Sequence, residues 1–320
     1  MLLPDGRVLI VGGVADEDSD VALVMTAIFD PISGTFAEGP RMSRPRRSMT
    51  LVPLGDGTVL ISGGWGSDPA EDVAEIFDPS NDSVRPADSH IQRGDAMHAA
   101  LADGRALIAG GYDGTEVLRS AETYDPATSA FAATGNMATP RIGGTAGLVA
   151  DHRVLVCGGT DYVQSYSACE IFDPASGQFS EVAPMGEARE YATSVSLNDG
   201  RVLVLGGYRS DVALATAEIY DPATDSWSAT DPMAFGRGSP VVAGLASGRV
   251  LVAGGESGDH GASVASASIL DPATGSFEEI EPMLHGRAIA ATVVLSDGRV
   301  LIAGGLGASG ALAQSEIYQP

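Results

Sequence analysis

Short apolar runs recur along the chain, each preceded by a polar turn and followed by two glycines. In one copy, Val202–Leu205 reads VLVL without alternation, which is typical of a strand buried on both faces. The Asp-Gly pair before it suits the positive φ angles of a tight hairpin turn, and residues 191–197 are rich in Ser, Thr and Val, as strands are. The pattern predicts a hairpin whose second strand ends at two glycines, where backbone can approach closely.

Two further strands complete this copy. Residues 217–222 read AEIYDP, a third strand ended by proline, and residues 225–229 turn into a fourth strand that carries Trp227. Four antiparallel strands form one small sheet whose apolar faces need covering from outside. We therefore expect neighbouring copies to cover them.

The copies repeat with a period of about fifty residues, since successive glycine pairs are separated by 47 to 51 residues. A period that runs from end to end predicts one domain rather than two. The pairs are Gly12-Gly13, Gly63-Gly64, Gly110-Gly111, Gly158-Gly159, Gly206-Gly207, Gly254-Gly255 and Gly304-Gly305.

Three features of the copies resemble kelch repeats: the glycine pair after a buried strand, the AEIYDP element and the aromatic of the fourth strand. The aromatics are Phe36, Phe131, Phe179, Trp227 and Phe277. The resemblance implies an all-β, seven-bladed kelch-type β-propeller, similar to the central propeller of galactose oxidase. It implies little about function, because kelch propellers include protein-binding modules, sugar-processing enzymes and copper oxidases.

The two ends of the array are expected to be incomplete. The first copy lacks an inner strand beyond Leu2 and Leu3, and the last copy stops at Pro320 before an outer strand. Six blades with a degenerate start is the alternative. The expected blades are residues 1–40, 41–88, 89–136, 137–184, 185–232, 233–282 and 283–320.

The amino-acid composition indicates which classes of binding partner are disfavoured. The chain has 320 residues, with 18 basic and 42 acidic side chains and a net charge of −24. Nucleic acid is disfavoured as a partner, because phosphate contacts need clustered positive charge. Membrane insertion is disfavoured too, because no apolar run approaches the length of a span. Localisation is left open; a cell-surface or extracellular site would fit if the N-terminus were truncated.

The sequence contains two cysteines, Cys157 and Cys169, and they occupy slots that hold small or apolar residues in other copies. We expect free core thiols here rather than a disulfide or a redox pair, since free cysteine packs like a small hydrophobe.

Six arginines stand 17 residues before the first glycine of their pairs, where they are expected to surround one mouth of a central channel. One hypothesis is a positive collar that binds an acidic ligand. The other is a structural ion pair with a glutamate of the same copy. Because Ser268 takes the glutamate's place in the sixth copy, Arg237 is the collar member expected to bind a ligand, with Arg47 as a further candidate. The six are Arg46, Arg93, Arg141, Arg189, Arg237 and Arg287.

The loops after the glycine pairs vary between copies and are expected to carry the binding residues. Trp65, Tyr112 and Tyr208 directly follow glycine pairs; they either form an aromatic rim for a sugar or peptide, or shield neighbouring blades. His260 and His285 are either a general base or metal pair, or isolated surface histidines.

Three functions stay open. The first is a non-catalytic propeller that binds a protein or a glycan, with an acidic ligand suggested by the collar. The second is a carbohydrate-active enzyme such as a sugar mutarotase or epimerase, and the third is a structural module of a larger surface protein. No cofactor is expected: the cysteines and histidines do not follow the copper oxidase pattern, and the acidic run at residues 15–20 lacks the pattern of a calcium loop.

Overall fold

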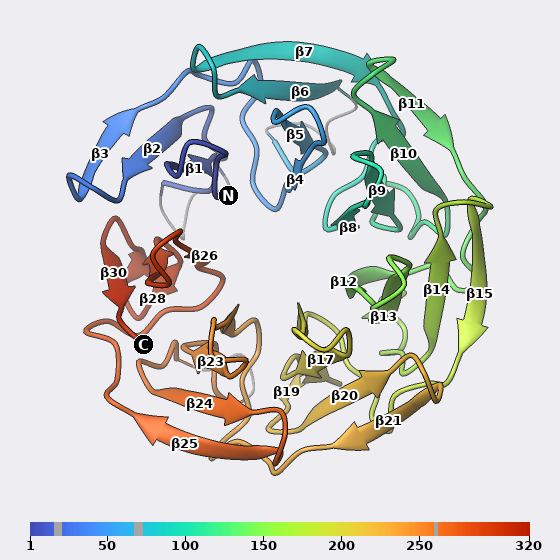
Figure 1. Cartoon of the computed structure of the whole chain (residues 1–320), viewed down its shortest axis with the longest axis vertical. Helices are drawn as coiled ribbons and strands as arrows, with labels where there is room; N and C mark the ends of the chain where they lie inside the picture. Colours follow the sequence, from blue (N-terminus) through green and yellow to red (C-terminus); the bar gives the residue numbers. More distant parts are fainter. Residues whose placement is uncertain (16–20, 67–72, 259–261) are drawn as a thin grey trace. The chain divides into compact units, whose positions relative to one another are not determined.

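The computed structural model describes residues 1–15, 21–66, 73–258 and 262–320. Within these ranges the regular elements are all β-strands, and they form seven blade sheets and two small hairpins (Figure 1). The fold is a seven-bladed β-propeller, as expected from the repeats. In the described part of the chain no helix meets the length and hydrophobicity that a membrane span requires.

The first three sheets follow one another in the chain. The first contains β1 (Val8–Val11), β2 (Thr26–Asp30) and β3 (Thr35–Glu38). The second contains β4 (Thr50–Pro53), β5 (Val59–Ser62), β6 (Val73–Asp78) and β7 (Ser83–Ser89). The third contains β8 (Met97–Ala100), β9 (Ala106–Ala109), β10 (Ala121–Asp125) and β11 (Ala130–Ala133).

The later sheets repeat this order. The fourth contains β12 (Ile142–Leu148), β13 (Val154–Thr160), β14 (Cys169–Asp173) and β15 (Gln178–Val182). The fifth contains β16 (Thr193–Ser196), β17 (Val202–Leu205), β20 (Ala217–Asp221) and β21 (Ser226–Ala229). The sixth contains β22 (Val241–Gly244), β23 (Val250–Ala253), β24 (Ala267–Asp271) and β25 (Ser276–Ile280). The seventh contains β26 (Ala291–Val294), β27 (Val300–Ala303) and β30 (Ser315–Tyr318).

The two hairpins lie in loops that follow glycine pairs. They are β18 (Tyr208–Arg209) with β19 (Val212–Ala213), and β28 (Leu306–Gly307) with β29 (Gly310–Ala311). Among the described residues, the first sheet lacks an inner strand and the seventh an outer one, so the expectation of incomplete end blades is confirmed.

The chain forms two compact units, residues 1–142 with 173–179 and residues 143–172 with 180–320. In the first unit the inner strands β4 and β8 lie side by side; in the second, β22 lies beside both β16 and β26. The side chains between sheets form the core: Leu203 and Ile219 of the fifth sheet pack with Val252 and Leu270 of the sixth. Neighbouring copies thus cover the apolar faces that one sheet leaves open.

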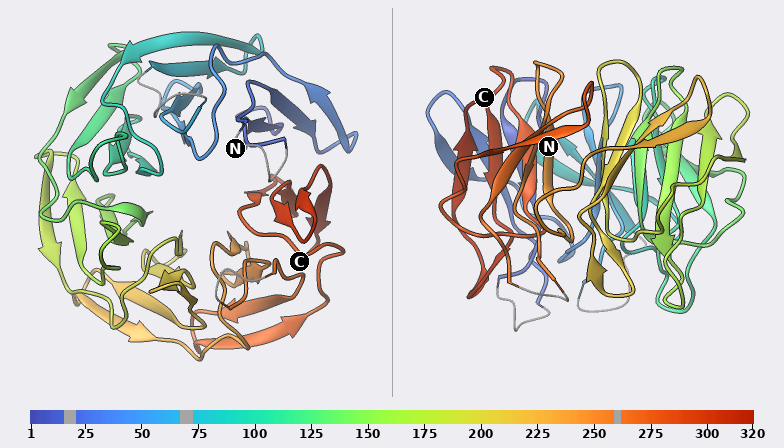
Figure 2. Two further views of the ribbon diagram at one scale, coloured as in Figure 1. Left: turned by 180° about the vertical axis from the view of Figure 1, so that it is seen from behind. Right: turned by 90° about the horizontal axis from the view of Figure 1, so that it is seen from below.

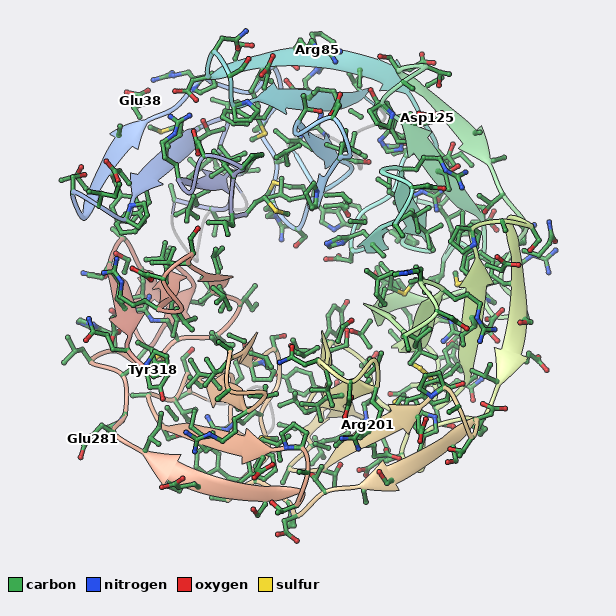
Figure 3. All side chains as sticks on the ribbon, viewed as in Figure 1. Glu38, Arg85, Asp125, Arg201, Glu281 and Tyr318 are labelled. Atoms are coloured by element: carbon green, nitrogen blue, oxygen red, sulfur yellow. A yellow bond between two sulfur atoms is a disulfide. The ribbon has the colours of Figure 1, made fainter. Side chains whose placement is uncertain are left out.

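Burial falls from the second strand to the fourth. All four residues of β17 are buried, whereas β21 is largely exposed and polar. Glu38 and Arg85 lie likewise on the outermost strands β3 and β7 of their sheets (Figure 3). The unalternating apolar runs therefore mark the second strand of each sheet.

The Asp-Gly-Arg triplets join neighbouring sheets as well as closing a hairpin. In the fifth sheet Gly200 has φ 84° in the turn, and Arg201 Nε donates to Asp199 Oδ2 at 2.8 Å. The Arg201 guanidinium also donates to the carbonyl of Pro272, in the turn of the sixth sheet, at 3.3 Å. Arg105 makes the same bond to Pro174 within the first unit, at 2.9 Å.

Candidate functional site

Antiparallel pairing places the arginine and the glycine pair of a sheet on the same side. The first strand begins after the arginine, and the second strand runs back to the glycine pair, as β16 and β17 do in the fifth sheet. We call this the loop side, and the opposite side, with the Asp-Gly turns, the turn side. For the fifth and sixth sheets Figure 2 shows the loops at the two ends of the strands.

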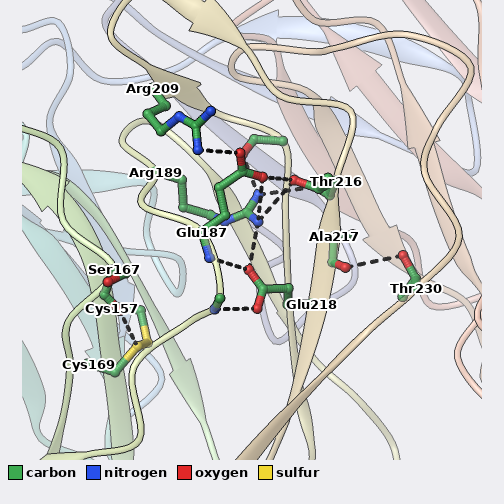
Figure 4. A network of polar contacts seen from close by, with 12 residues as sticks. Cys157, Ser167, Cys169, Glu187, Arg189, Arg209, Thr216, Ala217, Glu218 and Thr230 are labelled. Carbon is green, nitrogen blue, oxygen red and sulfur yellow. Dashed lines mark hydrogen bonds and ion pairs between the residues drawn. A yellow bond between two sulfur atoms is a disulfide. The ribbon is translucent and has the colours of Figure 1, made fainter.

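The six arginines with the 17-residue spacing are buried, each with at most 1% of its surface exposed. Arg189 is typical: Nη1 donates to the carbonyls of Gly206 and Thr216 at 2.9 and 3.1 Å, and Nη2 to Glu218 Oε1 at 2.9 Å (Figure 4). Among the described residues, equivalent ion pairs join Arg46 to Glu75, Arg93 to Glu122 and Arg287 to Glu316, at 2.7 to 3.3 Å. The structural pairing hypothesis is therefore confirmed in these blades.

Burial corrects the hypothesis of a positive collar. Arg237 has no exposed surface, and its guanidinium donates to the carbonyls of Gly254 and Ser266 while the ring of Phe235 lies 4.5 Å away. It therefore does not form part of an exposed positive surface on the loop side. Arg47 is half-buried, and its backbone pairs with that of Trp65 at 2.8 and 2.9 Å.

Trp65 belongs to a small cluster in the first unit. Its Nε1 donates to Asp95 Oδ2 at 2.8 Å, and its ring centroid lies 5.9 Å from that of Tyr112. A methyl group on Gly94 would lie 2.2 Å from the indole, so the ring covers the backbone of the next sheet. Burial raises the pKa of Asp95, although the hydrogen bond from Trp65 opposes this.

Tyr208 has the same place in the second unit. Its hydroxyl donates to Glu256 Oε2, and a methyl group on Gly238 would lie 1.9 Å from its ring. Burial and the neighbouring carboxylate raise the pKa of Tyr208. Tyr208 is only 5% exposed, and its ring covers the backbone of the next sheet at Gly238.

The predicted histidine pair is not brought together in the described structure. His260 lies outside the described residues, as does the acidic run at residues 16–20. His285 is exposed, with Nδ1 3.6 Å from Glu316 Oε1. Among the described residues, no group of three His, Cys, Asp or Glu side chains is placed to hold a metal ion.

The expectation of free thiols is wrong, because Cys157 and Cys169 form a disulfide. The two residues face each other across β13 and β14, and in the fifth sheet Leu205 and Ala217 are paired in the same way. The two slots are thus register partners in the repeat. This relation, rather than the residue types, was the signal that would have predicted the bond.

The disulfide closes the base of an ordered loop, residues 160–168, on the loop side of the second unit. Asp161 accepts the N–H groups of Val163 and Gln164 at 2.9 Å, and Thr160 Oγ1 donates to the carbonyl of Gln164 at 3.0 Å. The loop presents Tyr162 and Val163 to solvent, 61% and 88% exposed.

Tyr191 is a neighbouring exposed side chain that the sequence analysis did not single out. A methyl group on Gly143 would lie 2.8 Å from its ring, so the ring rests on that backbone, and it is 38% exposed. Ser165 of the loop donates to Glu190 Oε1 at 3.2 Å. This hydrogen bond joins the 160–168 loop to the segment before β16 that carries Tyr191. The hairpin β18–β19 adds Val212, 58% exposed.

Exposed large hydrophobic side chains of the second unit gather on this side. In its described part all of them except Ile317 belong to loop-side segments, and we call these the loop-side apolar residues. They are Tyr162, Val163, Tyr191, Val212, Leu284 and Ile289. The loops were predicted to vary, but these six residues were not predicted from the sequence.

Residues 142–186 and 191–234 match the Kelch motif family. These repeats are Kelch motifs. The glycine pair recurs in all seven copies, and the arginine 17 residues before it recurs in six. No curated protein matches the chain at a significant level.

Two solved structures share the fold. A fungal alcohol oxidase of the AA5 family in complex with copper is 16% identical, with a TM-score of 0.81, covering 100% of this chain and 73% of the oxidase. YjhT is 16% identical, with a TM-score of 0.69, covering 87% of this chain and 98% of YjhT. In this chain the two cysteines are joined in the disulfide, and the likeness to the oxidase, at 16% identity, concerns the fold alone.

Proposed function

We propose that the chain is a non-catalytic binding module that recognises a protein or a glycan through the loop side of its second unit. The observation that carries this proposal is the gathering of the loop-side apolar residues on ordered segments. Exposed apolar groups on a rigid scaffold are typical of binding surfaces, where aromatic side chains contribute most of the affinity.

The side chains, rather than the backbone, distinguish Tyr191 and Ile289. Both have φ angles in the left-handed region, 50° and 54°, and so do Ser48, Asp95 and Ser239, which likewise stand two residues after the arginine of their sheets. The large exposed side chains at this recurring position are therefore what supports the assignment.

Charge favours a neutral or cationic ligand over an acidic one. The six arginines that would attract an anion on the loop side are buried, and in the described structure four of them form ion pairs with glutamates. Asp161 and Glu190 lie beside the loop-side apolar residues, on a chain of net charge −24.

Binding of the purified chain to immobilised glycans and to a peptide array tests the proposal. For any ligand captured, Tyr191→Ala is expected to weaken binding about tenfold or more, as the loss of a buried aromatic contact does. Ile32→Ser is the matched control, because Ile32 is 97% exposed on a turn of the turn side. Equal affinity of Tyr191→Ala, Tyr162→Ala and the control would refute the proposed surface.

One observation favours the second candidate, a carbohydrate-active enzyme such as a sugar mutarotase or epimerase. Burial raises the pKa of the Asp95 carboxyl, which accepts a hydrogen bond from Trp65, and the ring of Tyr112 lies against that of Trp65. A carboxyl of raised pKa suits general acid–base chemistry on a sugar. The test is anomer exchange of aldoses by NMR: catalysis that Asp95→Asn abolishes would establish it, and exchange at the uncatalysed rate would exclude it for those sugars.

A further inference from the structure

The sixth sheet buries a cation without the carboxylate that accompanies it in other sheets. Ser268 stands where the fifth sheet has Glu218. Ser268 is the register partner of Val252 in the sixth sheet, as Glu218 is of Val204 in the fifth. Arg237 is nevertheless as buried as Arg189. Among the described residues Arg237 makes no ion pair, and its Nη2 donates to Ser266 Oγ at 3.0 Å.

The other sheets show what occupies this position. Glu218 Oε2 and Oε1 accept the N–H groups of Gly186 and Glu187 at 2.6 and 3.2 Å, in addition to the guanidinium of Arg189. Glu316 accepts the N–H groups of Leu284 and His285 at the same two distances. One negative charge is therefore held by a guanidinium and two backbone donors.

The sixth sheet has the two equivalent backbone N–H donors. Ala234 and Phe235 precede Arg237 by the same three and two residues, and within the described residues no protein group accepts their N–H groups. Ser268 is 1% exposed and its hydroxyl has no hydrogen-bond partner in the described structure. Serine carries a hydroxyl where glutamate carries a methylene and a carboxylate, so the side chain of Ser268 does not supply the acceptors that Glu218 gives these donors.

Other groups near Arg237 offset its charge only in part. Phe235 stacks on the guanidinium at 4.5 Å, a cation–π contact. Glu279 faces Ser268 across β24 and β25, but it is exposed and forms no ion pair with Arg237. Burial lowers the pKa of Arg237 and Glu279 opposes that shift. An uncompensated buried charge is strongly destabilising, and buried polar groups are normally satisfied by protein, water or ion.

We propose that the sixth sheet binds a small monovalent anion, of the size of chloride or formate, between Arg237 Nη2, Ser268 Oγ and the N–H groups of residues 234 and 235. The anion replaces the glutamate carboxylate of the other sheets. This site is separate from the loop-side apolar residues, so it stands or falls independently of the proposed function.

Thermal unfolding at constant ionic strength, with chloride exchanged for the larger gluconate, tests the site. The midpoint of the wild-type chain is expected to rise with chloride and saturate, because a ligand at a hundred times its dissociation constant lowers the unfolding constant about a hundredfold. Ser268→Glu supplies the carboxylate from within, so it should be more stable in gluconate and lose this chloride dependence. Formate in place of chloride distinguishes a halide from a carboxylate ligand.

A mirror variant strengthens the test. Glu218→Ser should leave a related site in the fifth sheet, with a loss of stability in gluconate that chloride restores only in part, because Glu187 Oε2 lies 3.9 Å from Arg189 Nη2. Equal chloride responses of wild type and Ser268→Glu would overturn the proposal, since a general salt effect acts on both. If Ser268→Glu does not fold, crystals of the wild type in bromide decide: an anomalous peak within hydrogen-bonding reach of Arg237 Nη2 supports the site, and its absence at saturating bromide refutes it.

Discussion

Replacing Glu218 by alanine tests whether the buried ion pairs stabilise the repeats. The carboxylate lies 2.9 Å from Arg189 Nη2 and accepts the N–H groups of Gly186 and Glu187. Alanine removes all of these acceptors at once. The guanidinium then stays buried without its principal counter-charge, because the carbonyls of Gly206 and Thr216 are neutral and Glu187 lies farther away, at 3.9 Å.

The expected loss follows from this geometry. Removing one partner of a buried ion pair costs about 3–5 kcal/mol, since the remaining charge is left uncompensated. Glu187 Oε2 lies 3.9 Å from Arg189 Nη2 and can offset part of the charge, although it also pairs with Arg209 at 2.9 Å (Figure 4). We therefore expect Glu218→Ala to lose about 3 kcal/mol, and Glu218→Ala with Glu187→Gln to reach the top of that range.

Urea unfolding at neutral pH measures this loss. Glu278→Ala is the matched control, because Glu278 is 74% exposed and only 3.6 Å from the exposed Arg249. Such a surface pair contributes about 0–1 kcal/mol. If Glu218→Ala and Glu278→Ala lose the same free energy of unfolding, the buried pair is not a source of stability and the reasoning fails.

Three further predictions concern other contacts. Gly238→Ala should cost about 1–3 kcal/mol by overpacking against Tyr208, and a second change of Tyr208 to alanine should reduce that penalty in the same urea titration. Replacing Cys157 and Cys169 by alanine should cost about 3 kcal/mol, and a reductant should then lower the unfolding midpoint of the wild type but not of the variant. The hydrogen bond from Arg201 in the turn lowers the pKa of Asp199, so the contribution of Asp199 to the free energy of unfolding is present at neutral pH and is lost as the pH falls below about 4. Asp199→Asn should therefore make the stability less dependent on pH in this range. An unchanged acid-unfolding curve would contradict this.

The fold was readable from the sequence because each strand carries its own signal. Val202–Leu205 is apolar throughout and proves to be buried throughout, and the glycine pair after it ends the strand. The ion pair between the arginine and the glutamate of one copy was one of two hypotheses, because the first copy lacks both residues, and four sheets of the described structure confirm it. Position along the repeat was enough for the fold and for this hypothesis.

Other features depend on register and depth, which spacing does not convey. The disulfide required knowing that positions 157 and 169 are opposed across a hairpin. The hypothesis of an exposed arginine collar failed because a charged residue just before a strand can be either buried or exposed. The packing of the neighbouring sheets determines which, and here it buries the six arginines. Trp65 covers Gly94 in the next sheet, a contact between copies rather than within one.

Comparison between copies separates structural positions from positions available for function. The recurring arginine and glutamate pair with each other and are buried between the sheets with the glycine pair, so they offer few groups to a ligand. The departures carry the remaining chemistry: Tyr162 and Tyr191 place exposed aromatic rings at loop-side positions, and Ser268 replaces the carboxylate that accompanies the arginine in other sheets. In a repeat protein, the residues that break the pattern are therefore the first places to search for a ligand.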